Sequence, residues 1–170
     1  NQVNCFFEDS QNTLWLGCPG GISKFNGAYF HSFAFEDSLA NFMVLDIEEL
    51  ESGDLLVATN GAGLFVFNPA DQNFEHLDSF KGGSFVRKIK RTTNGDLLIG
   101  SRAGLDRIVP PAYHKHETIL DSVSVSDIVL AENGAIWVST FGDGSFLLER
   151  SGILNIQEKE GLQNNLVREI

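Results

Sequence analysis

The chain has 170 residues, of which 42% are hydrophobic and 21% are charged, a composition typical of a globular protein and not of a disordered one. Its formal net charge of −11 at pH 7 opposes the phosphate neutralisation on which nucleic-acid binding depends, so we expect no nucleic-acid partner. No apolar run approaches the ~20 residues of a membrane span, so we expect this segment to make no membrane contact.

Four similar stretches recur along the chain at intervals of about 40 residues. Each consists of a turn residue, a small or polar residue, three apolar residues, a small residue, and a hydroxyl or thiol. The stretches are Asn12–Cys18, Gly53–Thr59, Gly95–Ser101 and Gly134–Thr140. A fixed period of this length indicates a repeat architecture. Trp15 and Trp137 hold equivalent places in it, and we expect both rings to be buried.

A second pattern precedes each of these stretches: a valine, two variable residues and a large apolar residue. It occurs as Val3–Phe6, Val44–Ile47, Val86–Ile89 and Val125–Ile128. Residues three apart in a strand point to opposite faces, so we expect both faces to be covered by neighbouring sheets. Val167–Ile170 is a fifth copy, so residues 166–170 are expected to open a further repeat and the chain to be a piece of a longer protein.

The two patterns are separated by turn residues. Asn94-Gly95 and Asn133-Gly134 stand there in the third and fourth repeats, with Gln11-Asn12 and Ser52-Gly53 in the first and second. Asn-Gly favours a two-residue type I′ turn, in which both residues have positive φ. Each repeat is therefore predicted to open with a tight antiparallel hairpin.

Two further strands complete each predicted repeat. The third is clearest at Leu64–Phe67, and the fourth is more polar, as in Asn73–Leu77. Four short strands per repeat, with hardly any helical period, predict an all-β fold in which each repeat is one four-stranded antiparallel blade of a β-propeller. The predicted repeats span about residues 1–41, 42–83, 84–124 and 125–165. A β-sandwich of four hairpins would explain the strand number but not the fixed period.

The residues Val3–Asp9, leading into Asn12–Gly17, resemble the two-component regulator propeller repeat of hybrid histidine kinase sensors. Glu160–Ile170 is similar to the junction between blades in that family. Leu56 and Leu98 depart from the family pattern, because they stand where it has tryptophan.

The resemblance implies a ligand-sensing region in the periplasmic or extracytoplasmic part of a membrane protein, often tied to carbohydrate uptake. It also implies a propeller with more than four blades. The expected partners are the remaining blades of the parent propeller and an oligosaccharide ligand, with a homo-oligomer as another way to cover exposed blade faces.

Cys5 and Cys18 are the only cysteines in the chain. If Gln11-Asn12 forms a two-residue turn, the two cysteines face each other across the hairpin, where a disulfide is geometrically possible. The periplasmic location implied by the resemblance would permit it. The alternative is a pair of small buried thiols, with Cys18 replacing the hydroxyl residue of the other repeats.

Candidate ligand-binding residues lie in the linkers and turns that converge at one end of the blades. Binding residues concentrate on such loops. The candidates are Asn41, Asn60, Arg102, Phe141, Asp143 and Asn165. We expect the run Arg87–Arg91 to be a solvated strand, with a local anion site as the alternative reading.

No catalytic group, cofactor site or metal site is expected. His114 and His116 could supply two ligands, but no third one follows at zinc-like spacing. The leading hypothesis is a non-enzymatic sensor fragment. A propeller enzyme similar to streptogramin lyases, which Asn133–Thr140 also resembles, and a protein-interaction scaffold are the alternatives.

Overall fold

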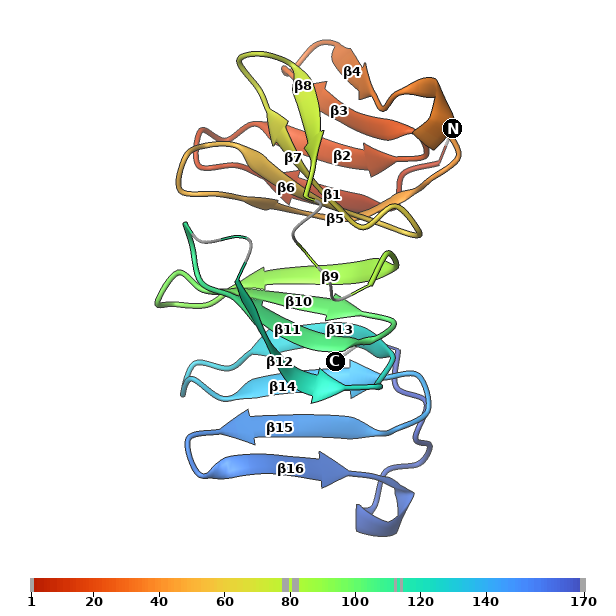
Figure 1. Cartoon of the computed structure of the whole chain (residues 1–170), viewed down its shortest axis with the longest axis vertical. Coiled ribbons are helices and arrows are strands. Elements are labelled where there is room, and N and C mark those ends of the chain that lie inside the picture. The colour runs from red at the N-terminus through yellow and green to blue at the C-terminus, as the bar shows by residue number, and fades with distance from the viewer. Residues whose placement is uncertain (1, 78–79, 81–82, 112, 114, 169–170) are drawn as a thin grey trace. The chain divides into compact units, whose positions relative to one another are not determined.

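The computed structural model describes residues 2–77, 80, 83–111, 113 and 115–168. These residues form four four-stranded antiparallel sheets, and within each sheet the strands are hydrogen-bonded in chain order. Figure 1 shows the four sheets, here called blades one to four. The predicted all-β fold, with one antiparallel sheet per repeat, is confirmed. His114 and residues 169–170 of the predicted further repeat lie outside the described residues.

The strands are short throughout. Blade one contains β1 (Cys5–Glu8), β2 (Leu14–Cys18), β3 (Gly21–Phe25) and β4 (Phe30–Ala34), and blade two contains β5 (Val44–Glu49), β6 (Leu55–Thr59), β7 (Leu64–Asn68) and β8 (Asn73–His76). Blade three contains β9 (Val86–Arg91), β10 (Leu97–Ser101), β11 (Gly104–Ile108) and β12 (His116–Asp121), and blade four contains β13 (Val125–Leu130), β14 (Ile136–Thr140), β15 (Ser145–Glu149) and β16 (Gly152–Ile156). Two 3₁₀ helices, η1 (Asp37–Leu39) and η2 (Glu158–Glu160), lie in linkers that follow the fourth strands.

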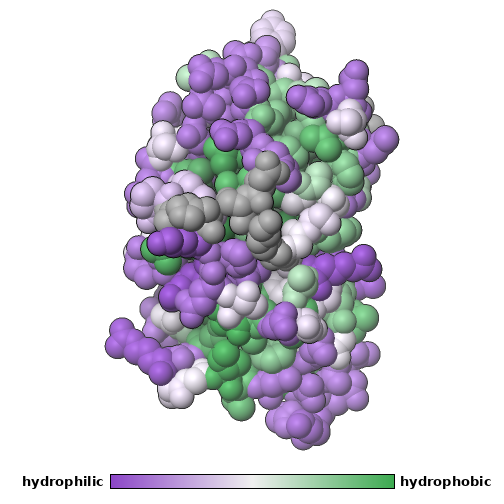
Figure 2. Space-filling model, viewed as in Figure 1, coloured by the Kyte–Doolittle hydropathy of each residue, from purple (hydrophilic) through white to green (hydrophobic). Residues whose placement is uncertain are grey.

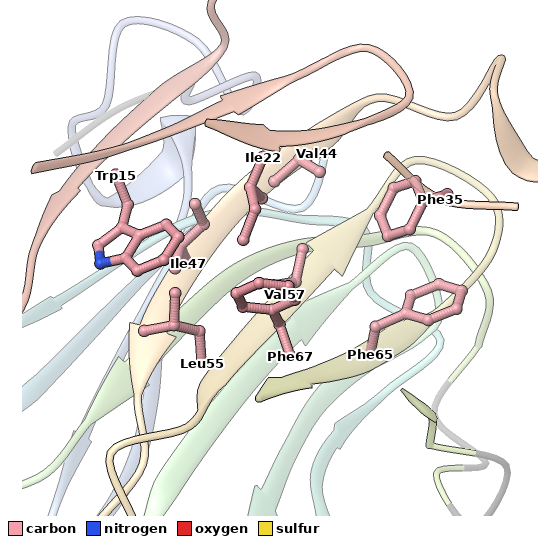
Figure 3. Close-up of a cluster of buried hydrophobic side chains, with 9 residues drawn as sticks. All are labelled: Trp15, Ile22, Phe35, Val44, Ile47, Leu55, Val57, Phe65 and Phe67. Carbon is pink, nitrogen blue, oxygen red and sulfur yellow. The ribbon is translucent and has the colours of Figure 1, made fainter. Parts of the chain in front are cut away.

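The chain divides into two compact units, Asn1–Val86 and Arg87–Ile170. The first unit holds blades one and two, and its core is a cluster of buried aromatic and aliphatic side chains. The cluster contains Trp15, Ile22, Phe35, Val44, Ile47, Leu55, Val57, Phe65 and Phe67. Phe35 and Phe65, 4.9 Å apart between centroids, lie at one end, with Trp15 at the other (Figure 3). Such aromatic pairs add specific geometry to the burial of apolar area.

The core of the second unit is built from aliphatic side chains of blades three and four. It contains Leu98, Leu105, Leu120, Val125, Ile128, Val138 and Leu148. Gly100 allows the close approach of the two blades, because a Cβ at that position would lie 2.6 Å from Val125 Cγ1. In each unit the first and second strands of one blade therefore pack on those of the next.

In blades two and four the two apolar residues of the first strand lie on one face, so the expectation of opposite faces is wrong there. Val44 and Ile47 both belong to the core of the first unit, and Val125 and Ile128 both belong to that of the second. The cause is a β-bulge, since the register shifts between Val44 and Asp46 and again between Val125 and Asp127. One extra residue in the inner strand restores the same orientation three positions later.

The hairpin turns also differ from the prediction. In blade three the Thr92 N–H donates to the Asp96 carbonyl oxygen and the Gly95 N–H to that of Thr92, which closes a three-residue loop instead of a two-residue one. Gly95 has φ of 89°, whereas Asn94 is not among the residues with positive φ. The loop is a type I turn followed by one left-handed residue, a form that requires glycine or asparagine at a single position. In blade one that residue is Asn12, with φ of 59°.

The longer turn moves the register of blade one by one residue and separates the cysteines. Cys5 pairs with Gly17, and Cys18 pairs with Gly21, so the predicted direct opposition of Cys5 and Cys18 is wrong. Gly17 and Cys18 are neighbours on β2, so they point to opposite faces. Cys5 packs against the core of the first unit, while Cys18 points away from it, and both residues are thiols in the structure.

One surface of blade one carries apolar side chains that lie outside the core of the first unit. This surface, the open face, contains Val3, Phe6, Leu16, Cys18 and Phe30. Phe6 and Phe30 are 66% and 61% exposed. Figure 2 shows hydrophobic side chains at the surface among hydrophilic ones. Sheet faces of this kind pack against a neighbouring blade inside each unit.

The two tryptophans differ in burial because they meet different surroundings. Trp15 is 1% exposed within the first core, whereas Trp137 is half-buried. Ile136 and Val138 belong to the second core or pack against it, so Trp137 between them points to the other face of blade four. The expectation that both rings are buried is wrong for Trp137.

Candidate functional site

The predicted binding residues of the first unit are Asn41 and Asn60. Asn41 lies in an exposed turn between η1 and β5. Asn60 follows β6 and bonds to Met43 twice: its N–H donates to the Met43 carbonyl oxygen at 3.0 Å, and its Oδ1 accepts the Met43 N–H at 2.6 Å. The Asn60 side-chain oxygen is therefore engaged by the backbone just before β5.

The second unit contains the other four predicted residues. Arg102 is exposed in the turn between β10 and β11, and Asp143 is exposed in the equivalent turn of blade four. Phe141 is half-buried directly after β14. The Asn165 side chain is engaged by the backbone, because its Oδ1 accepts a hydrogen bond from the Glu158 N–H at 2.8 Å.

In blades two, three and four a hydroxyl at the end of the second strand shapes these turns. Thr140 Oγ1 donates to the Gly144 carbonyl oxygen at 2.7 Å and accepts the Asp143 N–H at 2.9 Å. Thr59 and Ser101 close the turns of blades two and three in the same way. The hydroxyl of the repeated motif is thus a structural group that places residues such as Arg102 and Asp143 at the loop end.

Arg87 contacts one of the predicted residues, Phe141. It lies at the beginning of β9, and its guanidinium carbon is 4.5 Å from the centroid of the Phe141 ring, within the range of a cation–π contact. Burial lowers the pKa of Arg87, and the nearby positive charge of Arg102 lowers it further.

The prediction of the site from sequence missed Arg87, although it noted the basic run to which this residue belongs. The signal lay in the comparison of repeats. Leu45 and Ser126 occupy the same position in the second and fourth repeats, so only the third repeat places a charge there. The following residue, Lys88, forms an ion pair with Asp127, with 3.6 Å between Nζ and Oδ1.

Two hollows in the first unit contain none of the predicted ligand-binding residues. The larger, about 710 Å³, lies against the open face and is lined in part by Val3, Leu16 and Phe30. The smaller, about 360 Å³, is lined in part by Lys24 and His31. Lys24 Nζ lies 5.6 Å from the centroid of the Trp15 ring, a ring already buried in the core.

Ionisable groups do not gather into a metal centre in the part of the chain that the structure describes: no group of three or more His, Cys, Asp or Glu residues there could hold a metal ion. The three described histidines, His31, His76 and His116, lie on the outermost strands β4, β8 and β12. Across the described ranges, no helix has the length and apolar character needed to cross a membrane.

The first repeat carries a sequence match to a known family. Residues 1–20 match the family model described as two component regulator propeller. This confirms the predicted resemblance. The match covers β1, the turn that follows it and β2, which form one of the two stretches on which the resemblance depended. No curated protein sequence matches the chain.

Solved structures resemble these propeller repeats over nearly their whole length. The extracellular domain of a hybrid two component system from B. thetaiotaomicron matches with a TM-score of 0.85 and 22% identity, covering 99% of this chain and 24% of that one. PorZ, a surface component of the type-IX secretion system of Porphyromonas gingivalis, matches with a TM-score of 0.77 and 22% identity, covering 97% and 28%. The fold is therefore that of propeller blades.

A lyase shares the same arrangement. Virginiamycin B lyase from Staphylococcus aureus, in a catalytically inactive form with quinupristin, matches with a TM-score of 0.72 and 14% identity, covering 91% of this chain and 55% of that one. The present chain spans about a quarter of the two hybrid-system domains that it resembles, 24% and 25% of their lengths. Four blades are thus a part of what those larger structures contain.

Proposed function

We propose that these repeats form part of the extracytoplasmic, ligand-sensing region of a two-component signalling protein, and that the ligand is carbohydrate-derived. The observation that carries the proposal is the likeness to the extracellular domain of a hybrid two component system, with a TM-score of 0.85 over 99% of the chain. The match of residues 1–20 to the regulator propeller family supports it. A periplasmic location follows from the same proposal.

In this proposal the remaining blades of the parent propeller are the partners of the chain. The open face of blade one and the half-buried Trp137 of blade four are the surfaces that neighbouring blades would cover. The start of a fifth blade agrees with this arrangement, because the Val167 N–H donates to the Thr140 carbonyl oxygen at 2.9 Å. The four repeats would then end near residues 41, 83, 124 and 165. Further repeats would adjoin the first and the last of them.

The ligand is proposed to bind at the loop ends of the blades, where Asn41 presents its side chain in the first unit and Arg102, Phe141 and Asp143 present theirs in the second. Asn60 and Asn165 would support this surface through their backbone contacts instead of touching the ligand. An aromatic ring, a guanidinium and exposed polar groups are the side chains that recognise sugars in a rigid scaffold of loops.

The test is a binding screen with the whole protein that carries these repeats. Calorimetric titration with a panel of neutral and acidic oligosaccharides should give saturable binding to at least one. The Asp143→Ala and Phe141→Leu variants should weaken that binding, and Asp71→Ala, in the turn between β7 and β8, is the matched control. Saturable binding to no oligosaccharide would overturn the carbohydrate part of the proposal.

A propeller lyase is the second candidate, because the lyase structure also matches with a TM-score of 0.72. Incubation of the protein with quinupristin, followed by liquid chromatography and tandem mass spectrometry, tests it, because an elimination within one molecule can change its structure without changing its mass. A product with a new retention time and fragmentation pattern would establish the enzyme, and unchanged quinupristin would leave the sensor proposal in place.

A further inference from the structure

The smaller hollow of the first unit, about 360 Å³, is lined by residues of both blade one and blade two. Its volume lies in the range of small-molecule sites. Lys24 of β3 and His31 of β4 line it from blade one, together with Asn26 from the turn between these strands, and Pro69 lines it from blade two. None of the described residues that line the hollow is acidic.

The sheet of blade one places Lys24 and His31 side by side. They lie directly opposite each other on neighbouring strands, a register that brings two Cβ atoms to within about 4.5–5.5 Å. Lys24 also lies opposite Trp15, with its Nζ 5.6 Å from the centroid of that ring. The His31 ring packs on Phe33, with 4.7 Å between the centroids. Aromatic rings thus hold both side chains on one face of the blade.

The polar groups of this hollow are suited to an anion. Lys24 has three N–H donors and no acceptor, and it forms no ion pair with a described residue. Asn26 Oδ1 accepts the Ala28 N–H at 3.1 Å and the Tyr29 N–H at 2.9 Å. The amide nitrogen of Asn26, a donor, is therefore the polar end of this side chain that the turn does not use.

Blade three shows what a cation binds at the position of Lys24. Arg107 holds the same place in its sheet, opposite Leu98 on the second strand and Glu117 on the fourth. Its Nη2 donates to Glu117 Oε2 at 2.7 Å, and its Nε lies 3.8 Å from Asp96 Oδ2. In that blade the cation is thus paired with carboxylates of its own sheet.

Blade one has the cation without these carboxylates. His31 takes the place of the glutamate, directly opposite Lys24, and Thr13 takes the place of the aspartate. The fold requires no charge in this row, because the second and fourth repeats have Val66 and Leu147 where blade one has the lysine. A bound oxyanion would complete the row of blade one as the glutamate does in blade three.

We propose that the hollow binds the oxyanion of a small acidic molecule, a carboxylate or a sulfate, with Lys24 as the cationic contact and His31 and Asn26 as further donors. Charge-assisted hydrogen bonds of this kind are among the strongest in proteins. Lys24 is half-buried, and water screens the attraction less there than at an exposed lysine. Phe33 and Pro69 provide apolar walls for the rest of the molecule.

This site is separate from the one in the proposed function. The hollow contains none of the residues proposed to bind the sensed ligand. The turn that holds Asn26 follows β3, so it lies at the opposite end of that strand from the turn between β2 and β3. The net charge of −11 for the chain makes a local cationic hollow selective, since the acidic surface repels anions elsewhere.

The experiment measures binding of sodium glucuronate, sodium sulfate and glucose to the whole protein that carries these repeats. Isothermal titration is run at constant ionic strength, set with sodium chloride, because salt screens charges. Glucuronate and sulfate distinguish a carboxylated from a sulfated source of the oxyanion, and glucose reports binding without charge. Reductive methylation of lysines, followed by peptide mass spectrometry, locates the site, because a bound oxyanion should slow the modification of Lys24 but not that of Lys159, whose side chain is 73% exposed.

The variants follow the repeats themselves. Lys24→Leu removes the cation and introduces the residue that the fourth repeat has at this position. His31→Glu keeps the lysine and rebuilds the ion pair of blade three, so an internal carboxylate occupies the ammonium group. Lys159→Leu is the matched control, because it makes the same substitution at an exposed lysine of η2. Thermal unfolding of each variant shows that it remains folded.

We expect at least one anion to bind and to slow the methylation of Lys24 several-fold at saturation, while Lys159 keeps its rate. The Kd of that anion should rise about tenfold or more in Lys24→Leu and in His31→Glu, as for loss of a charged hydrogen bond. It should stay unchanged in Lys159→Leu, and glucose should not compete.

The inference is overturned if neither anion protects Lys24, or if Lys24→Leu or His31→Glu binds the anion with the wild-type Kd. None of these outcomes bears on the proposed function, whose test depends on oligosaccharides and on substitutions at Phe141 and Asp143.

Discussion

Trp15 joins the hairpin of blade one to the core of the first unit. Its Nε1–H donates to Asp9 Oδ2 at 2.8 Å, and its ring lies 5.7 Å from that of Phe67, edge to face. One side chain thus contributes apolar burial to the interface between blades one and two, and a hydrogen bond to the turn between β1 and β2.

We expect Trp15→Ala to lower the free energy of unfolding by ~3–5 kcal/mol, the cost of a large cavity in a packed core. Trp137→Ala should cost about half of that or less, because Trp137 is half-buried in this chain and truncation leaves a smaller cavity. Urea unfolding of the two variants measures the difference. Equal losses would contradict the unequal surroundings of the two rings.

Asp9 organises the first turn through its carboxylate, which accepts the Thr13 N–H at 2.8 Å and the Gln11 N–H at 2.9 Å. Burial alone would raise the pKa of Asp9, but the hydrogen bonds from Trp15, Thr13 and Gln11 outweigh it and hold the pKa below its ordinary value of 3.8. A depressed pKa in the folded state means that the folded protein favours the charged carboxylate.

The contribution of Asp9 to stability is therefore present above pH 3.8 and is lost as the pH falls through the lower, folded-state pKa. We expect Asp9→Asn to flatten the decline in stability over that acidic range. Urea unfolding as a function of pH checks this, with Asp71→Asn as the control on an exposed turn. A decline of the same steepness in Asp9→Asn and wild type would show that another carboxylate causes it.

At the scale of the element, each hairpin depends on one left-handed residue at the end of its three-residue loop. Gly134 has φ of 82°, and a Cβ there would meet no atom within 4 Å. A substitution at Gly134 therefore tests backbone strain alone, without a steric clash.

We expect Gly134→Ala to cost about 1–2 kcal/mol, the strain of a left-handed residue with a Cβ. Gly134→Asn should cost less, because asparagine tolerates this conformation and Asn12 adopts it in blade one. Thermal or urea unfolding of the two variants ranks them. A loss for Gly134→Asn as large as that for Gly134→Ala would indicate that the turn requires glycine for another reason.

The elements show what the sequence could predict and what it could not. The 40-residue period and the apolar second strand of each repeat were sufficient to predict four-stranded blades, because every repeat has a similar pattern of apolar residues. The bulge at Val44 and Asp46 was not predictable from spacing, since a valine three residues before an isoleucine suits opposite faces equally well. Asn94-Gly95 is likewise compatible with both turn types, and only the hydrogen-bonding pattern distinguishes them.

The places of the candidate residues in the fold were predictable, but their contacts were not. Sequence indicated the loop end correctly as the place where Arg102 and Phe141 lie. It could not reveal that the amides of Asn60 and Asn165 are engaged by Met43 and Glu158. Arg87 was missed because its cation–π contact is with a ring that lies more than fifty positions later in the chain.

At the scale of the whole molecule, the open face of blade one determines how the chain behaves alone. Exposed apolar surfaces of this kind promote association. We expect the 170-residue chain to self-associate as its concentration rises, and Phe6→Ser combined with Phe30→Ser to reduce this association. Light scattering coupled to size-exclusion chromatography measures the mass.

The matched control for that experiment is Tyr29→Ser, because Tyr29 is 76% exposed but does not line the hollow against the open face. A chain that is monomeric at all concentrations, or that associates equally in wild type and the double variant, would exclude the open face as the contact. A longer protein in which further blades precede blade one should remain monomeric with Phe6 and Phe30 intact.

Backbone contacts connect the blades in addition to the apolar cores. In three of the blades the residue after the second strand forms a bridge to the linker that leads onward, as between Pro19 and Met43 and between Phe141 and Leu166. Pro19 has no N–H, and the N–H of the next residue, Gly20, donates to the Phe42 carbonyl oxygen at 2.8 Å. A joint made of peptide groups tolerates almost any side chain, so sequences can diverge freely while the geometry persists. Two chains that agree at 22% of positions can therefore superimpose with a TM-score of 0.85.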